Sequence, residues 1–299
     1  MKTFYECLPC FVNQALSSLT RTGATVDQIE KTMRKVFCEL AVIDFNASPP
    51  FTASKIYREV SKETNVVDPY IDTKRRSNQY AMRILSEMQD QIGAGSNVFL
   101  LKVKLAIAAN IIDFGKHANL TECEVLACFN TALEKSIDEE AVISLSEVVQ
   151  SADSVLFLCD NAGEIVFDRY LIQELPRQKI TCAVRGAPAI NDALLEDASF
   201  VGLSDTVKVI SNGSDIPGTV LETCSDEFKK AFYDADVVIA KGQGNFETLS
   251  EIKNKRIFFL LQVKCPVIAR DIGFPIGTFV IKDNCSGRTI ELNDQMLVK

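Results

Sequence analysis

The chain has 299 residues, of which 47% are hydrophobic and 24% charged, and its formal net charge is −8. This length accommodates about two domains of ordinary globular composition. The negative charge argues against a nucleic-acid partner, because such binders neutralise phosphates with lysine and arginine. No secretory signal or membrane-spanning apolar stretch is evident, so we expect a cytoplasmic protein without a membrane partner, whose ten cysteines are mostly reduced and buried.

Residues 1–148 are predicted to form a helical N-terminal domain. Apolar residues recur at helical spacing over 24–40, 53–64, 70–91 and 100–117, with proline-containing breaks between the earlier segments. In the last segment, Asn110 and Asp113 are three positions apart and therefore share one face of an otherwise apolar helix. Polar side chains in such a place need a partner, either neighbouring backbone or a ligand.

Cys7 and Cys10 have the spacing of a metal-binding or redox pair. No second pair follows, and His117 is the only histidine, so no zinc knuckle can be completed locally. Two interpretations stay open: both thiols belong to the core of a helix face, or a distant thiol such as Cys265 joins them in a site.

Residues 149–299 alternate between strand and helix patterns, which predicts a mainly parallel sheet with crossover helices. Strands are expected at 155–159, 179–184, 207–210, 236–240 and 257–261, with an edge strand at 278–281. Helices are expected from 165, from 191 and over 218–232. The strands end in Asp, Asn, Gly, Ser or Lys, as expected if their carboxyl ends share one pocket.

The first of these strands ends at Asp160 and Asn161. A carboxylate beside an amide oxygen provides hard donors suited to Mg²⁺ or Mn²⁺. Both residue types are also favoured helix N-caps, so a capping role explains the pair equally well.

The fourth strand ends at Lys241 and Gly242. Backbone N–H groups near a helix start, beside a lysine, suit one phosphate group; an exposed loop lysine is the alternative. The dinucleotide fingerprint is incomplete, because Glu247 occupies the position of its third glycine, and no Walker sequence occurs. With one histidine and no Gly-x-Ser-x-Gly, metal-assisted attack by water is the mechanism for which adequate residues exist.

Four segments of the second half carry a family resemblance: Cys-Asp-Asn-Ala-Gly-Glu at 159–164, Arg-Gly-Ala-Pro-Ala-Ile-Asn-Asp-Ala at 185–193, Asp-Val-Val-Ile-Ala-Lys-Gly-Gln-Gly-Asn-Phe-Glu at 236–247 and Val-Lys-Cys-Pro-Val at 263–267. With Cys-Leu-Pro-Cys at 7–10, Pro-Pro at 49–50 and Asn-Ile-Ile-Asp-Phe-Gly at 110–115, the chain resembles the metal-dependent damage-control phosphatases, long catalogued as domain of unknown function 89. It resembles the branch with an N-terminal Cys-x-x-Cys.

The resemblance implies a Rossmann-like, mainly parallel α/β domain over 149–299, packed on the helical domain. It implies a divalent metal, Mn²⁺, Mg²⁺, Co²⁺ or Ni²⁺, on Asp160, Asn161 and Asp192, although Asn191 competes with Asp192 as the ligand. It also implies that Lys241 binds the phosphate. We extend the substrate site to the following residues: Asn110, Asp113, Glu164, Arg185, Gly242 and Glu247.

The implied function is hydrolysis of small phosphate monoesters, such as sugar phosphates or damaged phosphometabolites. Asp113 or Glu164 is a candidate for orienting water or protonating the leaving group. Direct attack by water and a route through an aspartyl phosphate both stay open, as does the oligomeric state. The alternative function is a non-catalytic module that binds metal and a phosphorylated metabolite without turnover.

Overall fold

The structure is a computed structural model that describes residues 1–109 and 122–285. The helices that precede the sheet are η1 (Tyr5–Cys7), α1 (Leu8–Arg21), α2 (Val26–Ala41), α3 (Pro49–Thr64), α4 (Ile71–Gly93), α5 (Val98–Ala108), α6 (Glu122–Glu134) and α7 (Glu139–Ser151). The elements that follow are β1 (Val155–Leu158), α8 (Glu164–Ile172), η2 (Arg177–Lys179), β2 (Ile180–Val184), α9 (Leu195–Phe200), β3 (Lys208–Ser211), η3 (Leu221–Thr223), α10 (Asp226–Asp234), β4 (Val237–Lys241), α11 (Gly242–Leu249), β5 (Arg256–Gln262), α12 (Pro266–Ile272) and β6 (Phe279–Asp283).

The fold is of the α/β class, and its strands form one mixed sheet in the order β3-β2-β1-β4-β5-β6. β1 to β5 run parallel, and β6 closes one edge antiparallel to β5. The expected mainly parallel sheet is therefore confirmed. The chain leaves β1 toward β2 on one side and returns to β4 on the other, and ligands bind at such a reversal, beyond the carboxyl ends of the strands.

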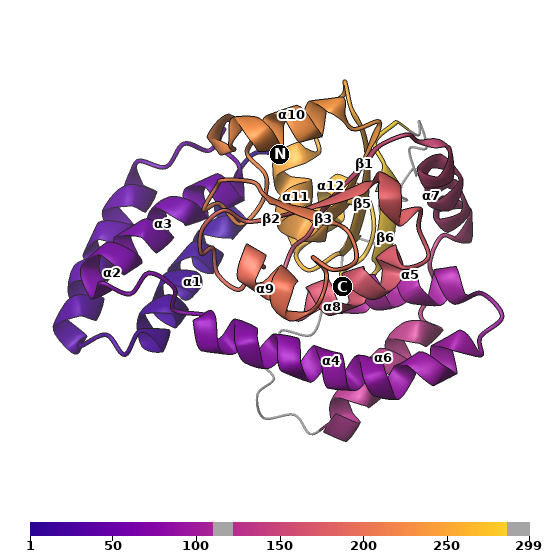
Figure 1. Cartoon of the computed structure of the whole chain (residues 1–299). Helices are drawn as coiled ribbons and strands as arrows, with labels where there is room; N and C mark the ends of the chain where they lie inside the picture. The colour runs from indigo at the N-terminus through magenta and orange to yellow at the C-terminus, as the bar shows by residue number, and fades with distance from the viewer. Residues whose placement is uncertain (110–121, 286–299) are drawn as a thin grey trace.

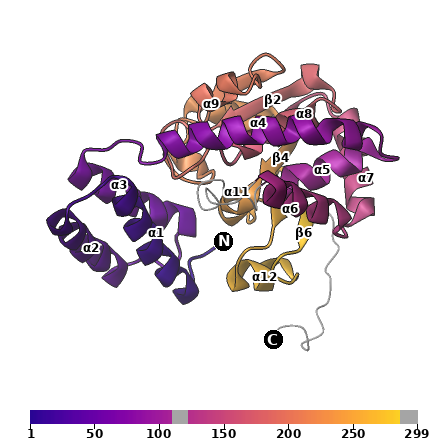
Figure 2. The same cartoon turned by 90° about the horizontal axis from the view of Figure 1, so that it is seen from below.

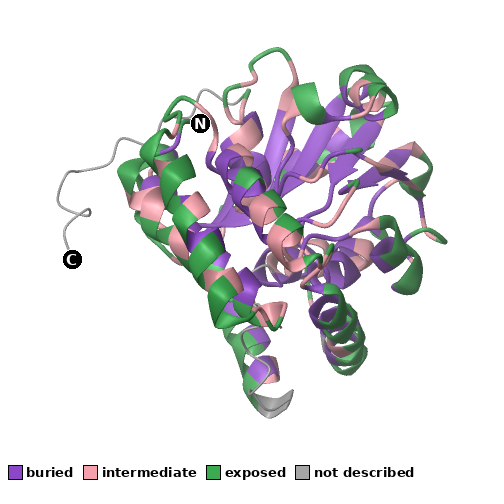
Figure 3. Ribbon diagram, turned by 90° about the vertical axis from the view of Figure 1, so that its left-hand side faces the viewer, coloured by how far each residue is buried: buried purple, intermediate pink, exposed green. Residues whose placement is uncertain are grey.

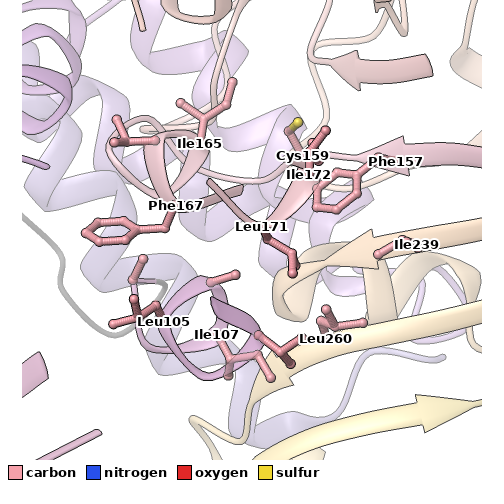
Figure 4. Packing of buried hydrophobic residues seen from close by; sticks show 14 of the residues in the cluster. Leu105, Ile107, Phe157, Cys159, Ile165, Phe167, Leu171, Ile172, Ile239 and Leu260 are labelled. Carbon is pink, nitrogen blue, oxygen red and sulfur yellow. The ribbon is translucent and has the colours of Figure 1, made fainter. Parts of the chain in front are cut away.

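Helices cover both faces of the sheet, which explains why β1 is buried along its whole length. Successive strand residues point to opposite faces, so Phe157 belongs to one core and Leu156 to the other. Figure 4 shows Phe157 with Phe167 of α8 and Leu105 of α5 in the first of these cores. The second core contains side chains of α10, α11 and α12. Figure 3 shows the buried strands inside helices that expose only their outer faces.

The helices before the sheet fall into two groups. Side chains of α4 to α7 belong to the same core as the sheet. By contrast, α1, α2 and α3 have a core of their own, around Phe11, Val36 and Ile56. Figures 1 and 2 show these three helices together at one side, while α4 runs along the α/β part. A domain boundary at 148/149 stays a prediction. The core of α1 to α3 is separate from the core that α4 to α7 share with the sheet, so the helices divide earlier in the chain, between α3 and α4.

Two expected helices differ from the structure. The helix expected from residue 191 begins only at Leu195, because Asp192 pairs with Asn161 in a β-bridge. The helix expected over 218–232 is replaced by η3 and then α10, which Ser225 caps through the Phe228 N–H. In the ranges 1–109 and 122–285, no helix has the length and apolarity to cross a bilayer. Asn110, Asp113 and His117 lie outside the described residues.

Candidate active site

The loops after β1 and β2 are joined by backbone hydrogen bonds at the carboxyl edge of the sheet. The Ala193 N–H donates to the Asp160 carbonyl at 2.8 Å, and the Ala162 N–H donates to the Asn191 carbonyl at 2.9 Å. This pairing brings Asp160, Asn161 and Asp192 together, although 32 positions separate the two aspartates in sequence. Asn191 also lines the cleft in front of them, so its competition with Asp192 stays open.

The second loop carries a backbone conformation that L-residues rarely adopt. Ile190 has φ of +46°, and a β-branched residue with positive φ is an outlier. Such strain persists only where surrounding contacts fix it, and it concentrates at functional sites. Here it lies two residues before Asp192, in the wall of the cleft.

Asp160 and Asp192 share one arginine. Arg185 Nε donates to Asp192 Oδ2 at 2.6 Å, and Arg185 Nη2 lies 3.6 Å from Asp160 Oδ1. All three side chains are buried. Burial, followed by the negative charges of Asp192 and Glu164, raises the pKa of Asp160 to about 8 despite the arginine. Burial and the neighbouring carboxylates together therefore outweigh the effects of Arg185 and Lys264 on Asp160.

Asp160 does not cap the following helix. The N-cap of α8 is Gly163, without a side-chain cap. Asn161 Nδ2 instead donates to Asp160 Oδ2 at 2.8 Å and to Glu164 Oε2 at 3.0 Å. These bonds fix the amide between two carboxylates, so the capping interpretation of the Asp-Asn pair is wrong.

Lys241 lies behind this site in a fully buried cluster. Its ammonium donates to Glu164 at 2.6 Å, to Asp168 at 2.5 Å and to the Ala106 carbonyl at 2.8 Å. Burial lowers its pKa, but Asp168 and Glu164 outweigh burial and hold the pKa above its ordinary value. An ammonium has three N–H donors. All three are used, so this arrangement does not offer Lys241 to a phosphate, contrary to expectation, and the exposed-loop alternative is wrong as well.

The glycines after β4 have backbone reasons for their presence. Gly242 opens α11 with φ of +77°, the left-handed region that favours glycine. A Cβ at Gly244 would lie 2.3 Å from the Pro217 carbonyl oxygen. Close packing of α11 on the backbone at Pro217 explains Gly244 without a bound phosphate.

The donor atoms at this edge of the sheet suit a hard cation. Four carboxylates (Asp160, Glu164, Asp168 and Asp192) face Arg185 and Lys241 in the two clusters, and Lys264 of the cleft wall also lowers the pKa of Asp160. Asp160, Asn161 and Asp192 offer the oxygen donors that hard cations prefer. No group of three or more His, Cys, Asp or Glu side chains in the described part of the chain is arranged to hold a metal. An ion at this place would accordingly need the Asn161 amide.

A cleft of about 630 Å³ lies between the sheet edge and the helices α1 and α3. Its walls carry Asp160, Asn161 and Asp192 on one side and polar residues of α1 on the other. Arg185, Glu164 and Lys241 lie behind the wall rather than in it.

A profile of the damage-control phosphatase ARMT1-like domain matches residues 3–280. The chain belongs to this family. A damage-control phosphatase of Pyrococcus horikoshii is 37% identical over 293 residues, which cover 95% of this chain and 99% of that protein. A damage-control phosphatase of Archaeoglobus fulgidus is 35% identical over 235 residues, covering 77% and 81%. The crystal structure of a protein of the domain-of-unknown-function-89 family from Pyrococcus horikoshii superposes with a TM-score of 0.87 at 37% identity, covering 95% and 99%.

In this member of the damage-control phosphatase family, two neighbouring N-terminal cysteines and a distant third line one cleft. Cys7, Cys10 and Cys265 meet there with Glu247, whose carboxylate accepts from Gln243 Nε2 at 2.7 Å. Burial raises the pKa of Cys7 and of Cys265, and Glu247 adds to both effects, so these thiols stay protonated. Burial likewise raises the pKa of Glu247 to about 7.

Two residues that support the site, Asp168 and Asn78, were not predicted from the sequence. Asp168 holds Lys241 from the next turn of α8 after Glu164, a spacing that could have indicated a shared face. Asn78 of α4 accepts from the Gly163 N–H at 2.6 Å and donates to Asp197 Oδ1 at 2.7 Å. No local signal indicates Asn78, because its partners lie 85 and 119 positions away.

Proposed function

We propose that the protein is a metal-dependent phosphoric monoester hydrolase that acts on small phosphorylated metabolites, such as sugar phosphates or damaged phosphometabolites. One observation carries the proposal: Asp160, Asn161 and Asp192, brought together by the loops after β1 and β2, line a cleft at the strand reversal. The names of the two relatives, both damage-control phosphatases, support the same reaction.

Asp160, Asn161 and Asp192 would hold the ion, drawn from Mn²⁺, Mg²⁺, Co²⁺ and Ni²⁺. When bound, such an ion binds a phosphate oxygen and neutralises charge that develops during transfer. Arg185 orients Asp192 through its Nε–H, and its remaining donors face Thr219 and Asn245 at 3.4 Å and 3.3 Å. A direct contact between Arg185 and the substrate phosphate stays a prediction, because the guanidinium is buried behind the cleft wall.

Lys241 acts in this proposal without contacting the substrate. Its ammonium donates to Glu164 and Asp168 beneath the site, and Glu164 in turn accepts from the Asn161 amide. Gly242 provides the turn into α11, and Glu247 lines the cleft as a substrate-binding candidate. Roles for Asn110 and Asp113 in binding the substrate stay predictions.

Three broader predictions accompany this function. The strand order supports a Rossmann-like description of the sheet. Cys7 and Cys10 support a place in the Cys-x-x-Cys branch. We also propose that the protein works in the cytoplasm on a small metabolite, without a nucleic-acid partner.

The test is phosphate release from para-nitrophenyl phosphate and a panel of sugar phosphates, after chelation and restoration with each metal in turn. We expect metal-dependent release that falls at least about 100-fold in Asp160→Ala. Asp205→Ala is the matched control, because this exposed carboxylate precedes β3 and lies outside the cleft. Tight metal binding without release by any metal would favour the non-catalytic binding module instead.

A further inference from the structure

Four side chains of the cleft wall hold buried polar atoms without a hydrogen-bond partner in the part of the chain that the structure describes. They are Glu6 Oε2 on η1, Arg21 Nε on α1, Tyr57 Oη on α3 and Gln243 Oε1 on α11. All four residues line the same cleft as Asp160 and Asp192. Buried polar atoms in native proteins are nearly always paired, and each exception calls for an explanation such as a bound water, ion or ligand. The atoms come from four separate helices, so one packing defect does not account for them.

Arg21 has the chemistry of an anion-binding residue. Its guanidinium stacks over the Tyr70 ring at 4.8 Å, and Nη1 donates to Thr73 Oγ1 at 3.1 Å. None of the ion pairs formed by residues 1–109 and 122–285 includes Arg21. Stacking and one neutral hydrogen bond fix the planar fork but leave donors for an oxyanion. The cleft wall carries Glu6, Asp160, Asp192, Glu247 and Lys264, and Arg21 places a further cation on its α1 side. That cation favours an anion at this end of the cleft.

Tyr57 lies between the helical wall and the carboxylates. Burial raises the pKa of its phenol well above the ordinary value, and the nearby Tyr70 and Asp192 add to this effect. The hydroxyl therefore stays protonated and is available to donate or accept a hydrogen bond. Tyr57 lines the same cleft as Asp192, and Arg21 is held on the helical wall by Tyr70 and Thr73.

We propose that Arg21 and Tyr57 recognise the leaving group of the substrate, and that Arg21 binds a second acidic group on it. The substrate class is then a phosphate monoester that carries a carboxylate or another oxyanion away from the ester phosphate. This inference rests on the proposed phosphatase function. Specificity for the leaving group comes from the α1–α3 layer, while the sheet edge binds the phosphate that all substrates share.

The test compares two esters with the same carbon chain and the same phosphate. Sorbitol 6-phosphate ends in a hydroxymethyl group where 6-phosphogluconate ends in a carboxylate. We expect the wild-type protein to show a kcat/KM at least about tenfold higher for 6-phosphogluconate, the gain typical of one charge-assisted hydrogen bond. In Arg21→Gln this ratio falls to about one, and Arg21→Lys restores part of it. A loss of fold or of metal would lower both rates together and leave the ratio unchanged.

Tyr57→Phe removes one oxygen atom and is expected to raise KM about tenfold for both esters while kcat changes little. The matched controls are Arg34→Gln, on the exposed face of α2, and Tyr233→Phe, on the exposed face of α10. Thermal unfolding of each variant verifies that it is folded.

The two proposals fail in different ways. Metal-dependent release from para-nitrophenyl phosphate, with equal kcat/KM for the two esters or turnover of neither, would overturn the role of Arg21 alone. A ratio that persists in Arg21→Gln would do the same. Failure to release phosphate from any ester with any metal would overturn the phosphatase function and this inference with it.

Discussion

Two charged clusters lie one behind the other at the carboxyl edge of the sheet, and they differ in how their charge is balanced. In the inner cluster, Lys241 uses all its donors on Glu164, Asp168 and a backbone carbonyl. In the outer cluster, Arg185 is shared between Asp160 and Asp192, and the pKa of Asp160 is raised to about 8. The inner cluster is closed, whereas Asp160 and Asp192 of the outer cluster line the cleft. In this arrangement a ligand in the cleft has access to the outer carboxylates and not to Lys241.

The largest expected effect is on the inner cluster. Lys241→Met leaves two buried carboxylates without their cation, which we expect to lower the free energy of unfolding by about 3–5 kcal/mol. Urea denaturation measures the change. Lys230→Met removes an exposed lysine from its i,i+4 pair with Asp234 and should leave the free energy almost unchanged. A loss for Lys241→Met no greater than that of this control would show that the inner cluster is not structural.

For the outer cluster, we expect metal binding to raise the stability of the protein, and we expect removal of one carboxylate not to lower it. Saturation with Mn²⁺ at about 100 times its Kd should stabilise the wild-type protein by about 2.7 kcal/mol, or several degrees in Tm. Metal-free Asp160→Asn should be at least as stable as the metal-free wild type, because the substitution removes a buried charge next to Asp192. Its Tm should not respond to Mn²⁺. An equal response in both proteins would place the metal elsewhere.

A smaller effect concerns Glu247, the carboxylate on α11 at the other end of the cleft. Its folded pKa of about 7 exceeds the ordinary value of 4.5, so the folded state binds more protons between these values, and stability falls as pH rises through this window. Between pH 5.5 and 7.5, chelated Glu247→Gln should lose about 2 kcal/mol less stability than the wild type. The exposed Glu227→Gln serves as control. Parallel pH profiles for wild type and Glu247→Gln would show that Glu247 titrates normally.

The sequence was most informative where the signal is local. The continuous apolar runs at 155–158 and 257–261 predicted buried parallel strands, because both faces of such strands are covered. It was less informative at residues 191 and 192, where Asn and Asp are typical of a helix start. Pairing with Asn161, 31 positions away, holds Asp192 in a β-bridge instead and delays the helix to Leu195.

Long-range burial accounts for the remaining differences. The Lys-Gly sequence at 241–242 resembles a phosphate loop, but the two carboxylates that bind Lys241 lie 77 and 73 positions earlier on α8. Arg21 and Tyr57 were not recognised, because only the packing of α1 and α3 beside the sheet edge makes them part of the cleft. Residue types at the strand ends predicted where the site lies. The partner of each charged side chain could not be predicted, because these partners are distant in sequence and only the fold brings them together.

Anomalous diffraction from crystals grown with Mn²⁺ locates the divalent cation that we propose for the outer cluster. We predict one strong anomalous peak within coordination distance of oxygens from Asp160, Asn161 and Asp192, with Lys241 still bonded to Glu164 and Asp168. A peak at the cysteines of the cleft alone, or none at these three residues under saturating Mn²⁺, would contradict the account.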